Sequence, residues 1–205
     1  MIGIIDYGMG NIHSVANAFE HLGADAVVVA DPAALDDCER FVLPGVGAFN
    51  DCMANLHRTG FVEKLDALVN GERRPILGIC LGMQVMASRG FENGDTAGLG
   101  WFEGDVSLIE SRSAAERIPH VGWNELVDRR SSPLLEGIPA DADFYFVHSY
   151  AMRCRNDADV VARCGFAGGV TAIVSRGNIA ATQFHPEKSQ GYGLQLLENF
   201  LSWTP

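Results

Sequence analysis

The sequence predicts an α/β domain whose central sheet is mostly parallel in its first half and antiparallel in its second. Up to residue 80, apolar runs of strand length alternate with segments whose apolar residues recur at helical spacing. This alternation is typical of a parallel sheet that helices cover on both faces. After residue 100, candidate strands follow one another with little helix between them. Such spacing favours antiparallel pairing, so the chain should add an antiparallel portion to the parallel sheet.

The first half should contain four strands, at residues 2–5, 26–29, 41–43 and 74–79. Helical spacing appears between and after them, at 12–22, from 32, from 49, at 61–69 and at 83–87. Gly23 is expected to end the first helix, and Asp31 with Pro32 to open the second. Three loops follow strand ends, at residues 6–11, 44–49 and 80. Because ligands bind at the carboxyl ends of parallel strands, we expect these loops to meet at one functional edge.

The second half should contain strands near 105–109, 143–152, 159–164, 170–175 and 178–184. One helix closes the chain, with an apolar stripe formed by Leu194, Leu197, Phe200 and Leu201. No linker, internal repeat or low-complexity stretch interrupts the sequence. Residues 1–205 are therefore expected to form a single domain.

Composition argues against several classes of function. The 205 residues include 15 Lys and Arg against 26 Asp and Glu, which gives a net charge of −11. No basic run stands out, so nucleic acid is not expected as a partner. No apolar run approaches the roughly 18–20 residues of a membrane span, and the first residues enter a strand without a basic leader. We therefore expect a cytoplasmic protein that does not bind a membrane.

The cysteines support neither a disulfide framework nor a zinc site. There are five, an odd number, and no two are separated by only two residues: Cys38, Cys52, Cys80, Cys154 and Cys164. No metal is expected. Four of the five are best interpreted as small apolar fillers, and only Cys80 has a reactive setting.

The segment Gly78–Gly82 is the strongest candidate for chemistry. It reads Gly-Ile-Cys-Leu-Gly between a predicted buried strand and a predicted helix, which places Cys80 on a sharp turn. Glycines on both sides suit such a turn, because a side chain there would clash. The turn would present the sulfur beside free backbone amides, and the following helix N-terminus would favour the thiolate. The same pattern also fits a buried core cysteine between loop glycines. The choice between the two interpretations depends on whether a base lies near Cys80.

His185 is the best candidate for that base. Of the six histidines, it follows the apolar strand 179–184, and Glu187 stands two residues later with Pro186 between them. Proline keeps the preceding residue extended, and residues i and i+2 of an extended segment point the same way. The carboxylate can therefore reach and orient the imidazole. A turn with a surface histidine would show the same three-residue pattern. His13, His21 and His57 lie on predicted helices without an obvious partner.

These residues together resemble the class I glutamine amidotransferase family. The segments that carry the resemblance are Gly78–Gln84 and His185–Glu187. The resemblance implies a flavodoxin-like three-layer sandwich and hydrolysis of the glutamine side-chain amide to glutamate and ammonia. It assigns Cys80 as the nucleophile, His185 as the group that moves its proton, and Glu187 as the group that orients His185.

The resemblance also implies a substrate site and an oxyanion hole. Leu81 would supply an oxyanion amide because it follows the nucleophile, and Gln84 would bind glutamine. The loop after the third strand resembles the family's second oxyanion segment, formed here by Gly45, Val46 and Gly47. No nucleotide or other cofactor is expected, because the possible dinucleotide motif at Gly8 lacks its third glycine.

Several longer segments resemble one subfamily, the glutaminase subunits of imidazole glycerol phosphate synthase in histidine biosynthesis: Ile5–Asn11, Pro44–Phe49, Pro119–Asn124, Tyr145–Tyr150 and His185–Ser189. The subfamily passes ammonia to a (β/α)8-barrel cyclase subunit, with which it forms a heterodimer. By resemblance, the residues near that interface are Asn11, His120, Trp123, Tyr145 and Lys188. Core packing of Trp123 is the alternative interpretation.

Two other functions remain open on the sequence. The chain could supply ammonia to a different synthase, such as one that makes pyridoxal phosphate, anthranilate or purines. The segments around Trp123 and Tyr145 argue against it. The chain could also be a noncatalytic regulatory protein of the same fold, which the complete set Cys80, His185 and Glu187 makes a weaker hypothesis.

Overall fold

The structure, a computed structural model, describes residues 1–112 and 116–205. The strands of the first half are β1 (Ile2–Ile5), β2 (Ala26–Val29), β3 (Arg40–Gly45), β4 (Ile76–Cys80), β5 (Ala87–Gly90) and β6 (Thr96–Ala97). Those of the second half are β7 (Phe102–Leu108), β8 (His120–Val127), β9 (Asp143–His148), β10 (Tyr150–Cys154), β11 (Val160–Cys164), β12 (Val170–Arg176) and β13 (Ile179–Thr182). The α-helices are α1 (Ile12–His21), α2 (Phe49–Thr59), α3 (Phe61–Leu65), α4 (Leu81–Gln84) and α5 (Gln190–Ser202).

Nine strands form the main sheet, in the order β2-β1-β3-β4-β13-β12-β11-β8-β9. The first four strands run parallel, and β13 also pairs parallel with β4. From β13 outward, each further pairing is antiparallel. The predicted α/β class, parallel first and antiparallel later, is confirmed. Because β1, β3 and β4 are neighbours, the three predicted loops meet at one edge of the sheet, as expected.

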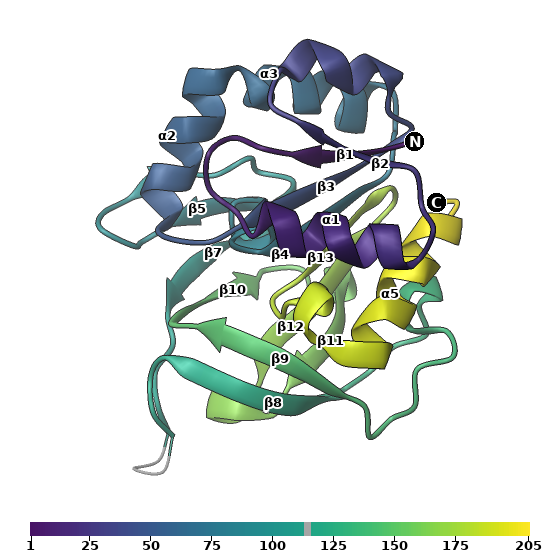
Figure 1. Cartoon of the computed structure of the whole chain (residues 1–205). Helices are drawn as coiled ribbons and strands as arrows, with labels where there is room; N and C mark the ends of the chain where they lie inside the picture. Colours follow the sequence, from purple (N-terminus) through teal and green to yellow (C-terminus); the bar gives the residue numbers. More distant parts are fainter. Residues whose placement is uncertain (113–115) are drawn as a thin grey trace.

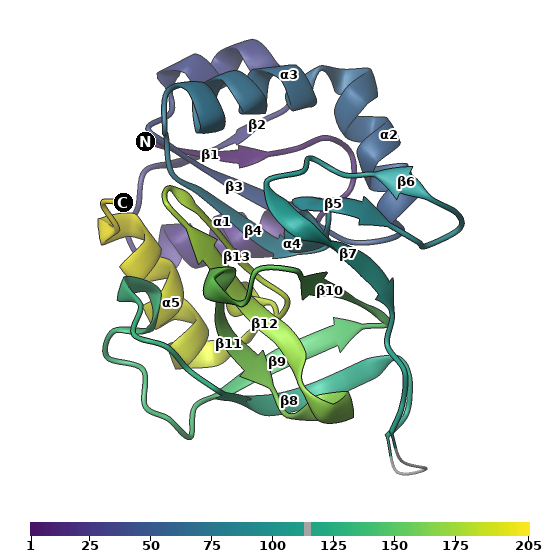
Figure 2. The same ribbon diagram turned by 180° about the vertical axis from the view of Figure 1, so that it is seen from behind.

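A smaller sheet, in the order β10-β7-β5-β6, packs on one face of the main sheet. Helices α2 and α3 cover the same face, and one apolar core joins them to the small sheet, with Phe41, Leu56, Phe61, Val106 and Met152 among its members. Figure 2 shows this side, with β5, β6, β7 and β10 in front of the main sheet. The small sheet therefore belongs to one outer layer of the sandwich.

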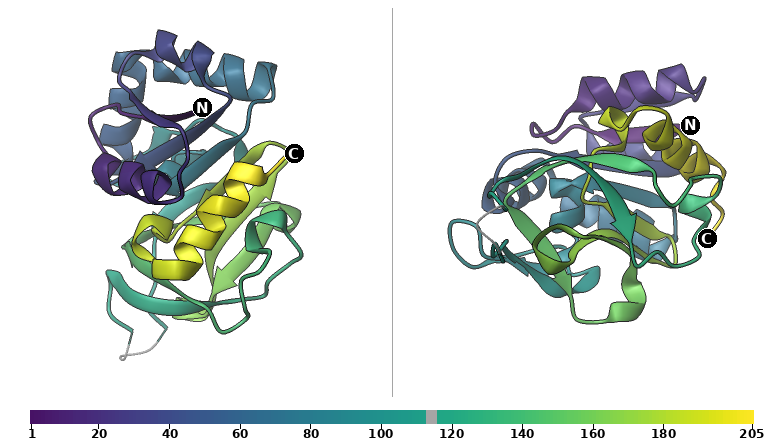
Figure 3. Two further views of the ribbon diagram at one scale, coloured as in Figure 1. Left: turned by 45° about the vertical axis from the view of Figure 1, so that its right-hand side comes forward. Right: turned by 90° about the horizontal axis from the view of Figure 1, so that it is seen from below.

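Helices α1 and α5 cover the opposite face (Figure 1). Their buried side chains, including Val15, Phe19, Leu197 and Phe200, share a second core with the main sheet. Figure 3 shows α5 lying across the strands of the second half. The three layers match the predicted sandwich. Within the described ranges, no helix combines the length and apolarity that a membrane crossing needs.

Local signals set several element ends as expected. Asp31 caps the 3-10 helix η1 (Pro32–Asp37), where its carboxylate accepts the Ala33 amide at 3.0 Å. Gly23 follows α1 with a φ of 68°, which a glycine adopts without strain. The predicted helix at 61–69 is divided, because α3 continues as a π-helical turn over Asp66–Gly71.

Two predictions of secondary structure are wrong. The predicted strand 143–152 is two strands, because the chain leaves the main sheet after β9 and enters the small sheet as β10. Ser149 lies between them, and its carbonyl accepts the Ile109 amide at 2.9 Å. The predicted helix at 83–87 is the single turn α4, after which Ala87 begins β5. Pairing of β5 with β7 outweighs the local helical spacing there.

Candidate active site

Cys80 joins β4 to α4 in a backbone conformation that is unusual for a residue with a side chain, with φ 55° and ψ −109°. Such a conformation costs about 1–3 kcal/mol and needs support from its surroundings. A Cβ atom on Gly82 would lie 1.8 Å from the Leu43 carbonyl oxygen, and one on Gly78 would lie 2.9 Å from the Gly82 carbonyl oxygen. Gly82 therefore lets the turn pack against β3, and Gly78 leaves room for the backbone of the turn at Gly82, which together explain the Gly-x-Cys-x-Gly spacing.

His185 follows the end of β13, on the strand next to the elbow strand. Its Nδ1 atom lies 2.8 Å from Glu187 Oε1, and neither side chain is more than 2% exposed. Burial disfavours the charged ring, but hydrogen bonds to Cys80 and Glu187 outweigh burial and raise the pKa of His185 to about 9. An imidazole that binds a proton this firmly beside a thiol can accept the thiol proton and hold it.

Two buried glutamine side chains continue this site. Gln183 donates from Nε2 to Cys80 Sγ at 3.7 Å. Gln84 donates from Nε2 to Gln183 Oε1 at 3.1 Å and to the Tyr150 carbonyl at 2.8 Å. Gln84 is 4% exposed and lies one helical turn after Cys80. Hydrogen bonds between side-chain amides therefore connect the sulfur to Tyr150, the first residue of β10.

The loop after β3 packs directly against the elbow. Gly45 is opposite Cys80 in the β3–β4 register, and a Cβ atom on Gly45 would lie 2.8 Å from both Gly82 N and Tyr7 Oη. The Tyr7 hydroxyl donates to the Pro44 carbonyl at 3.0 Å, which holds the start of the loop. Gly47 has a φ of 104°, so the chain turns back toward the elbow at a residue that adopts this conformation easily.

A cavity of about 310 Å³ lies over these residues. Its walls include Val46, Gly47, Cys80, Leu81, Gln84, His148 and His185. The structure thus brings the predicted nucleophile, base and substrate residues to one hollow. A thiol, an imidazole and backbone amides around a cavity of this size suit acyl transfer from a small amide substrate.

A family model, "Glutamine amidotransferase class-I", matches residues 3–203. The chain belongs to this family. The amidotransferase is also 47% identical over 214 residues to "Imidazole glycerol phosphate synthase subunit HisH" of Bradyrhizobium diazoefficiens, covering 100% of this chain and 99% of that protein. It is 47% identical over 201 residues to "Imidazole glycerol phosphate synthase subunit HisH 1" of Campylobacter jejuni, covering 98% of this chain and 99% of the relative.

Solved structures of low sequence identity share the fold of the amidotransferase. "Structure of PurLQS from Thermotoga maritima" superposes with a TM-score of 0.75 at 20% identity, over 98% of this chain and 96% of the other. "Crystal structure of glutamine amidotransferase" gives 0.74 at 21% identity, with the same coverages. These likenesses support the three-layer architecture and carry no information about substrate.

The residues expected at a partner interface lie in different settings. Trp123 is 44% exposed, which excludes the alternative that it packs in the core. Lys188 is also exposed. Tyr145 is half-buried opposite Trp123, with ring centroids 5.7 Å apart. Asn11 is also half-buried and donates to Glu187 Oε1 at 3.3 Å. His120 differs from these four, because it is 2% exposed and offers no surface for direct contact.

The structure adds residues that the sequence analysis of the amidotransferase missed. Gln183 and His148 border the reactive sulfur and the cavity, respectively. Gln183 stands two residues before His185, so the alternation of an extended segment could have indicated that both point to one side. No local signal marks His148, because its neighbour His120 is 28 residues away in the sequence and meets it only through β8–β9 pairing.

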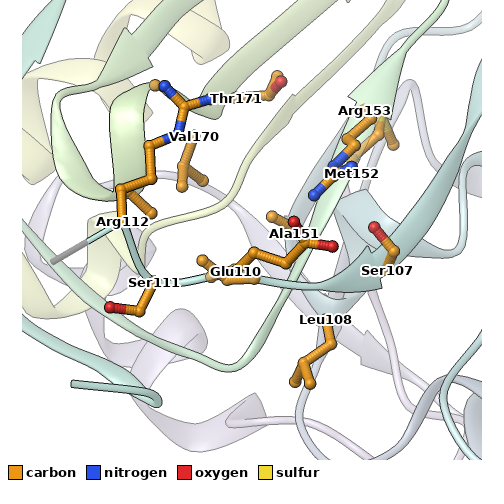
Figure 4. Close-up of a pocket in the computed structure, with 13 residues that line it drawn as sticks. Ser107, Leu108, Glu110, Ser111, Arg112, Ala151, Met152, Arg153, Val170 and Thr171 are labelled. Carbon is orange, nitrogen blue, oxygen red and sulfur yellow. The ribbon is translucent and has the colours of Figure 1, made fainter. Parts of the chain in front are cut away.

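A larger cavity, of about 410 Å³, lies elsewhere in the amidotransferase. Figure 4 shows residues from β7, β10 and β12 around it, including Ser107, Met152, Arg153 and Thr171. None of Cys80, His185 and Glu187 lines this cavity. The smaller cavity over the elbow is therefore the candidate active site, since the reactive groups meet there.

Proposed function

We propose that the chain is the glutaminase subunit of imidazole glycerol phosphate synthase and supplies ammonia to a (β/α)8-barrel cyclase partner. The observation that carries the proposal is Cys80 on a strained elbow, beside His185 and Glu187, in a chain that matches HisH proteins over its full length. The family match over residues 3–203 also supports one amidotransferase domain. Histidine biosynthesis is then its pathway, in the cytoplasm.

The first half of the reaction forms a thioester. Cys80 Sγ attacks the side-chain amide carbon of glutamine, and the thiol proton moves to His185. The amide C–N bond breaks as His185 returns this proton to the leaving nitrogen, which departs as ammonia. Glu187 accepts the Nδ1–H of His185, which keeps the opposite ring nitrogen directed toward the sulfur.

The second half of the reaction restores the thiol. His185 takes a proton from a water molecule, which attacks the thioester carbon. The C–S bond then breaks, glutamate is released, and His185 returns the proton to the Cys80 sulfur. Negative charge develops on the carbonyl oxygen in both halves. In this proposal the Leu81 amide and an amide of the Gly45–Gly47 segment bind that oxygen. Removal of one such donor costs about 3 kcal/mol in transition-state stabilisation.

We place the cyclase against the surface formed by Asn11, Trp123, Tyr145 and Lys188. An exposed Trp beside a Tyr is typical of an interface anchor. Asn11 also contacts Glu187, so this surface reaches the proposed triad through one hydrogen bond. His120 lies beneath this surface, because it is buried and belongs to the β8–β9 strand pair that carries Trp123 and Tyr145.

The proposal is tested by separating glutamine use from ammonia use in the assembled heterodimer. Cys80→Ala should reduce glutamine-dependent synthesis of imidazole glycerol phosphate by several orders of magnitude, because the nucleophile is lost. Synthesis from added ammonium should stay at the wild-type rate, because cyclisation occurs on the partner. Full glutamine use by Cys80→Ala would refute the proposed nucleophile. Failure of the wild-type pair to use glutamine would refute the proposed function.

A labelling experiment adds an independent readout. A glutamine analogue with an electrophilic side chain should modify Cys80 alone, because the other four thiols do not line the active-site cavity. Peptide mass mapping identifies the labelled residue. Modification of Cys38, Cys52, Cys154 or Cys164 instead would contradict the assignment.

A further inference from the structure

We propose that His120 and His148 are positioning residues for glutamine binding, which orient Gln84 through a chain of hydrogen bonds that begins at Asn124. This inference rests on the proposed glutaminase function. In this series of hydrogen bonds, Asn124 Nδ2 lies 2.9 Å from His120 Nε2, and His120 Nδ1 lies 3.0 Å from His148 Nε2. His148 Nδ1 then lies 2.8 Å from the Tyr150 carbonyl oxygen.

The chemistry of the Tyr150 carbonyl dictates the direction of every bond in the chain. A carbonyl oxygen only accepts, so His148 Nδ1 must carry the proton. In a neutral ring the other nitrogen is then an acceptor, which requires His120 Nδ1 to donate to it. His120 Nε2 in turn accepts, and the Asn124 side chain provides the N–H. One orientation therefore satisfies all three side chains at once.

Burial keeps both rings in this neutral form. His120 stacks between Phe146 and Phe166, with ring centroids 4.9 Å and 4.0 Å away. Desolvation lowers the pKa of His120 to about 4 and is also the main reason that the pKa of His148 falls to about 4. Among the described residues that contact His120 through these stacks and hydrogen bonds, His148 is the only titratable one; His148 in turn feels the charge of His185.

The series of hydrogen bonds ends at the Tyr150 carbonyl, which is not paired with a neighbouring strand. At the crossing between β9 and β10, the Ser149 carbonyl accepts the Ile109 amide. The next carbonyl, that of Tyr150, points to the opposite side because an extended backbone alternates. Its two hydrogen bonds come from side chains, His148 Nδ1 and Gln84 Nε2. His148 therefore holds the acceptor to which Gln84 is bound.

This arrangement decides what Gln84 offers to a substrate. Gln84 Nε2 has two hydrogens, and they are directed at the Tyr150 carbonyl and at Gln183 Oε1. Among the described residues, no donor contacts Gln84 Oε1. Because Gln84 lines the cavity, the group left for a ligand is this oxygen, an acceptor. It suits an N–H donor such as the α-ammonium group of glutamine, and it disfavours ligands that lack one.

The first test is His120→Phe in the heterodimer. Phenylalanine keeps the aromatic stack but leaves His148 without its donor, so Tyr150 and Gln84 lose their support. We expect KM for L-glutamine to rise about tenfold, the effect of one lost buried hydrogen bond, with kcat changed less than about threefold. A merely destabilised protein would instead lose active fraction, which lowers apparent kcat at constant KM. Val127→Thr, an exposed site on β8, is the matched control and should match wild type.

The second test reverses the direction of the hydrogen bond between residue 124 and His120, at the partly exposed start of the hydrogen-bond series. Asn124→Asp places an acceptor against His120 Nε2, which must then bind a proton. While His120 is charged, it still donates to His148 and KM stays low; as pH rises and His120 loses that charge, the donor is lost and KM rises. Asn124→Leu removes the Asn124 donor without adding a carboxylate, and His120 Nδ1–H can still donate to His148. Its KM should therefore stay near that of wild type and show no step between pH 6 and 9. Wild type should show no such step in KM.

The outcomes separate the two proposals. An unchanged KM in His120→Phe, or a KM of Asn124→Asp that follows wild type at all pH values, would overturn the positioning role while glutamine-dependent synthesis by wild type stands. Loss of kcat alone in both variants would also overturn it, because it indicates a structural role. Absence of glutamine use by wild type would overturn the proposed function and, with it, this inference.

Discussion

The two walls of the active-site cavity are built by different means. The wall that carries Cys80 is made of close backbone packing, where Gly45, Gly78 and Gly82 leave no room for a Cβ atom. The wall that carries Gln84 is made of side chains joined by hydrogen bonds, which extend through His148 and His120 to β8. The difference teaches that the proposed nucleophile is held by excluded volume, whereas the proposed substrate contact, Gln84, is held by the direction of polar groups.

The two walls should respond differently to substitution. Steric repulsion rises steeply as two atoms approach each other, so a single added methyl group on the first wall should disrupt the elbow. A hydrogen-bonded wall can lose one member and keep its shape, so its variants should show graded changes in substrate affinity. The largest effects should occur where the walls meet, at His185, and the smallest in the stability that the second wall contributes.

The largest expected effect is that of His185→Asn. Asparagine cannot accept the thiol proton and return it, so kcat for glutamine should fall about 10²–10⁴-fold. Glu187→Gln should cost less, because it keeps a hydrogen-bonding group beside His185 and removes only the charge. Steady-state glutamine hydrolysis by the two purified heterodimers measures the order. A slower Glu187→Gln enzyme of equal stability would reverse the assigned roles.

Loss of that charge should also change the pH dependence. The Glu187 carboxylate is one of the groups that raise the pKa of His185 to about 9. With glutamine in its place, the pKa of His185 should fall, so the corresponding step in the pH profile of kcat/KM should move to lower pH. An unmoved step in Glu187→Gln would show that the carboxylate does not act on His185.

The next effect concerns the backbone-built wall. Gly82→Ala would place a Cβ atom 1.8 Å from the Leu43 carbonyl oxygen, so β3 and the elbow must separate. We expect a loss of about 3 kcal/mol in the free energy of unfolding, measured by urea denaturation. Gly71→Ala is the control, because nothing lies within 4 Å of its Cβ position. Equal stability of Gly82→Ala and wild type would contradict the steric account.

The smallest expected effect is the acid sensitivity of the hydrogen-bonded wall. The pKa values of His120 and His148 are lowered in the folded state, so the unfolded chain binds more protons as pH falls below about 6.5. Stability from these two rings is complete above pH 6.5 and is lost toward pH 4. Between pH 7 and pH 5 the expected loss is about 2 kcal/mol for each ring, at 1.36 kcal/mol per pKa unit over the part of the shift that lies in this range.

The measurement compares two proteins at two pH values. Urea denaturation of wild type at pH 7 and pH 5 includes this loss together with that of the carboxylates. His120→Phe lacks one of the two rings, so its stability should fall less between the same pH values. An equal or larger fall in His120→Phe would contradict the linkage to this histidine pair.

Much of the fold and of the proposed catalytic set was predictable because the signals for both are local. Period and length of the apolar runs indicated the strands β1 to β4, and two glycines around Cys80 indicated the elbow. His185 and Glu187 are separated by one proline, so their contact depends on the geometry of three residues. In each case the deciding interaction lies within a few residues, where covalent geometry limits the alternatives.

Other features depended on strand pairing across the sequence, and local patterns misled. Strand β8 was missed, since its exposed residues alternate around Gly122 and Trp123 rather than form an apolar run. The strand predicted at 143–152 crosses between two sheets at Ser149, because its halves have different pairing partners. His120 was expected near the partner interface with Trp123; it faces the other side of the β8–β9 pair and is buried.

By itself, the sequence determined the α/β class and indicated the proposed nucleophile and its base, because chain geometry over a few residues decides which of these groups can meet. Only the tertiary structure decided which face of β8 is buried and which glutamine side chains border Cys80. It also set the directions of the bonds between Asn124 and Gln84. The physical reason is that a hydrogen bond between residues 28 or 66 positions apart exists only after strand register and helix placement have brought donor and acceptor together.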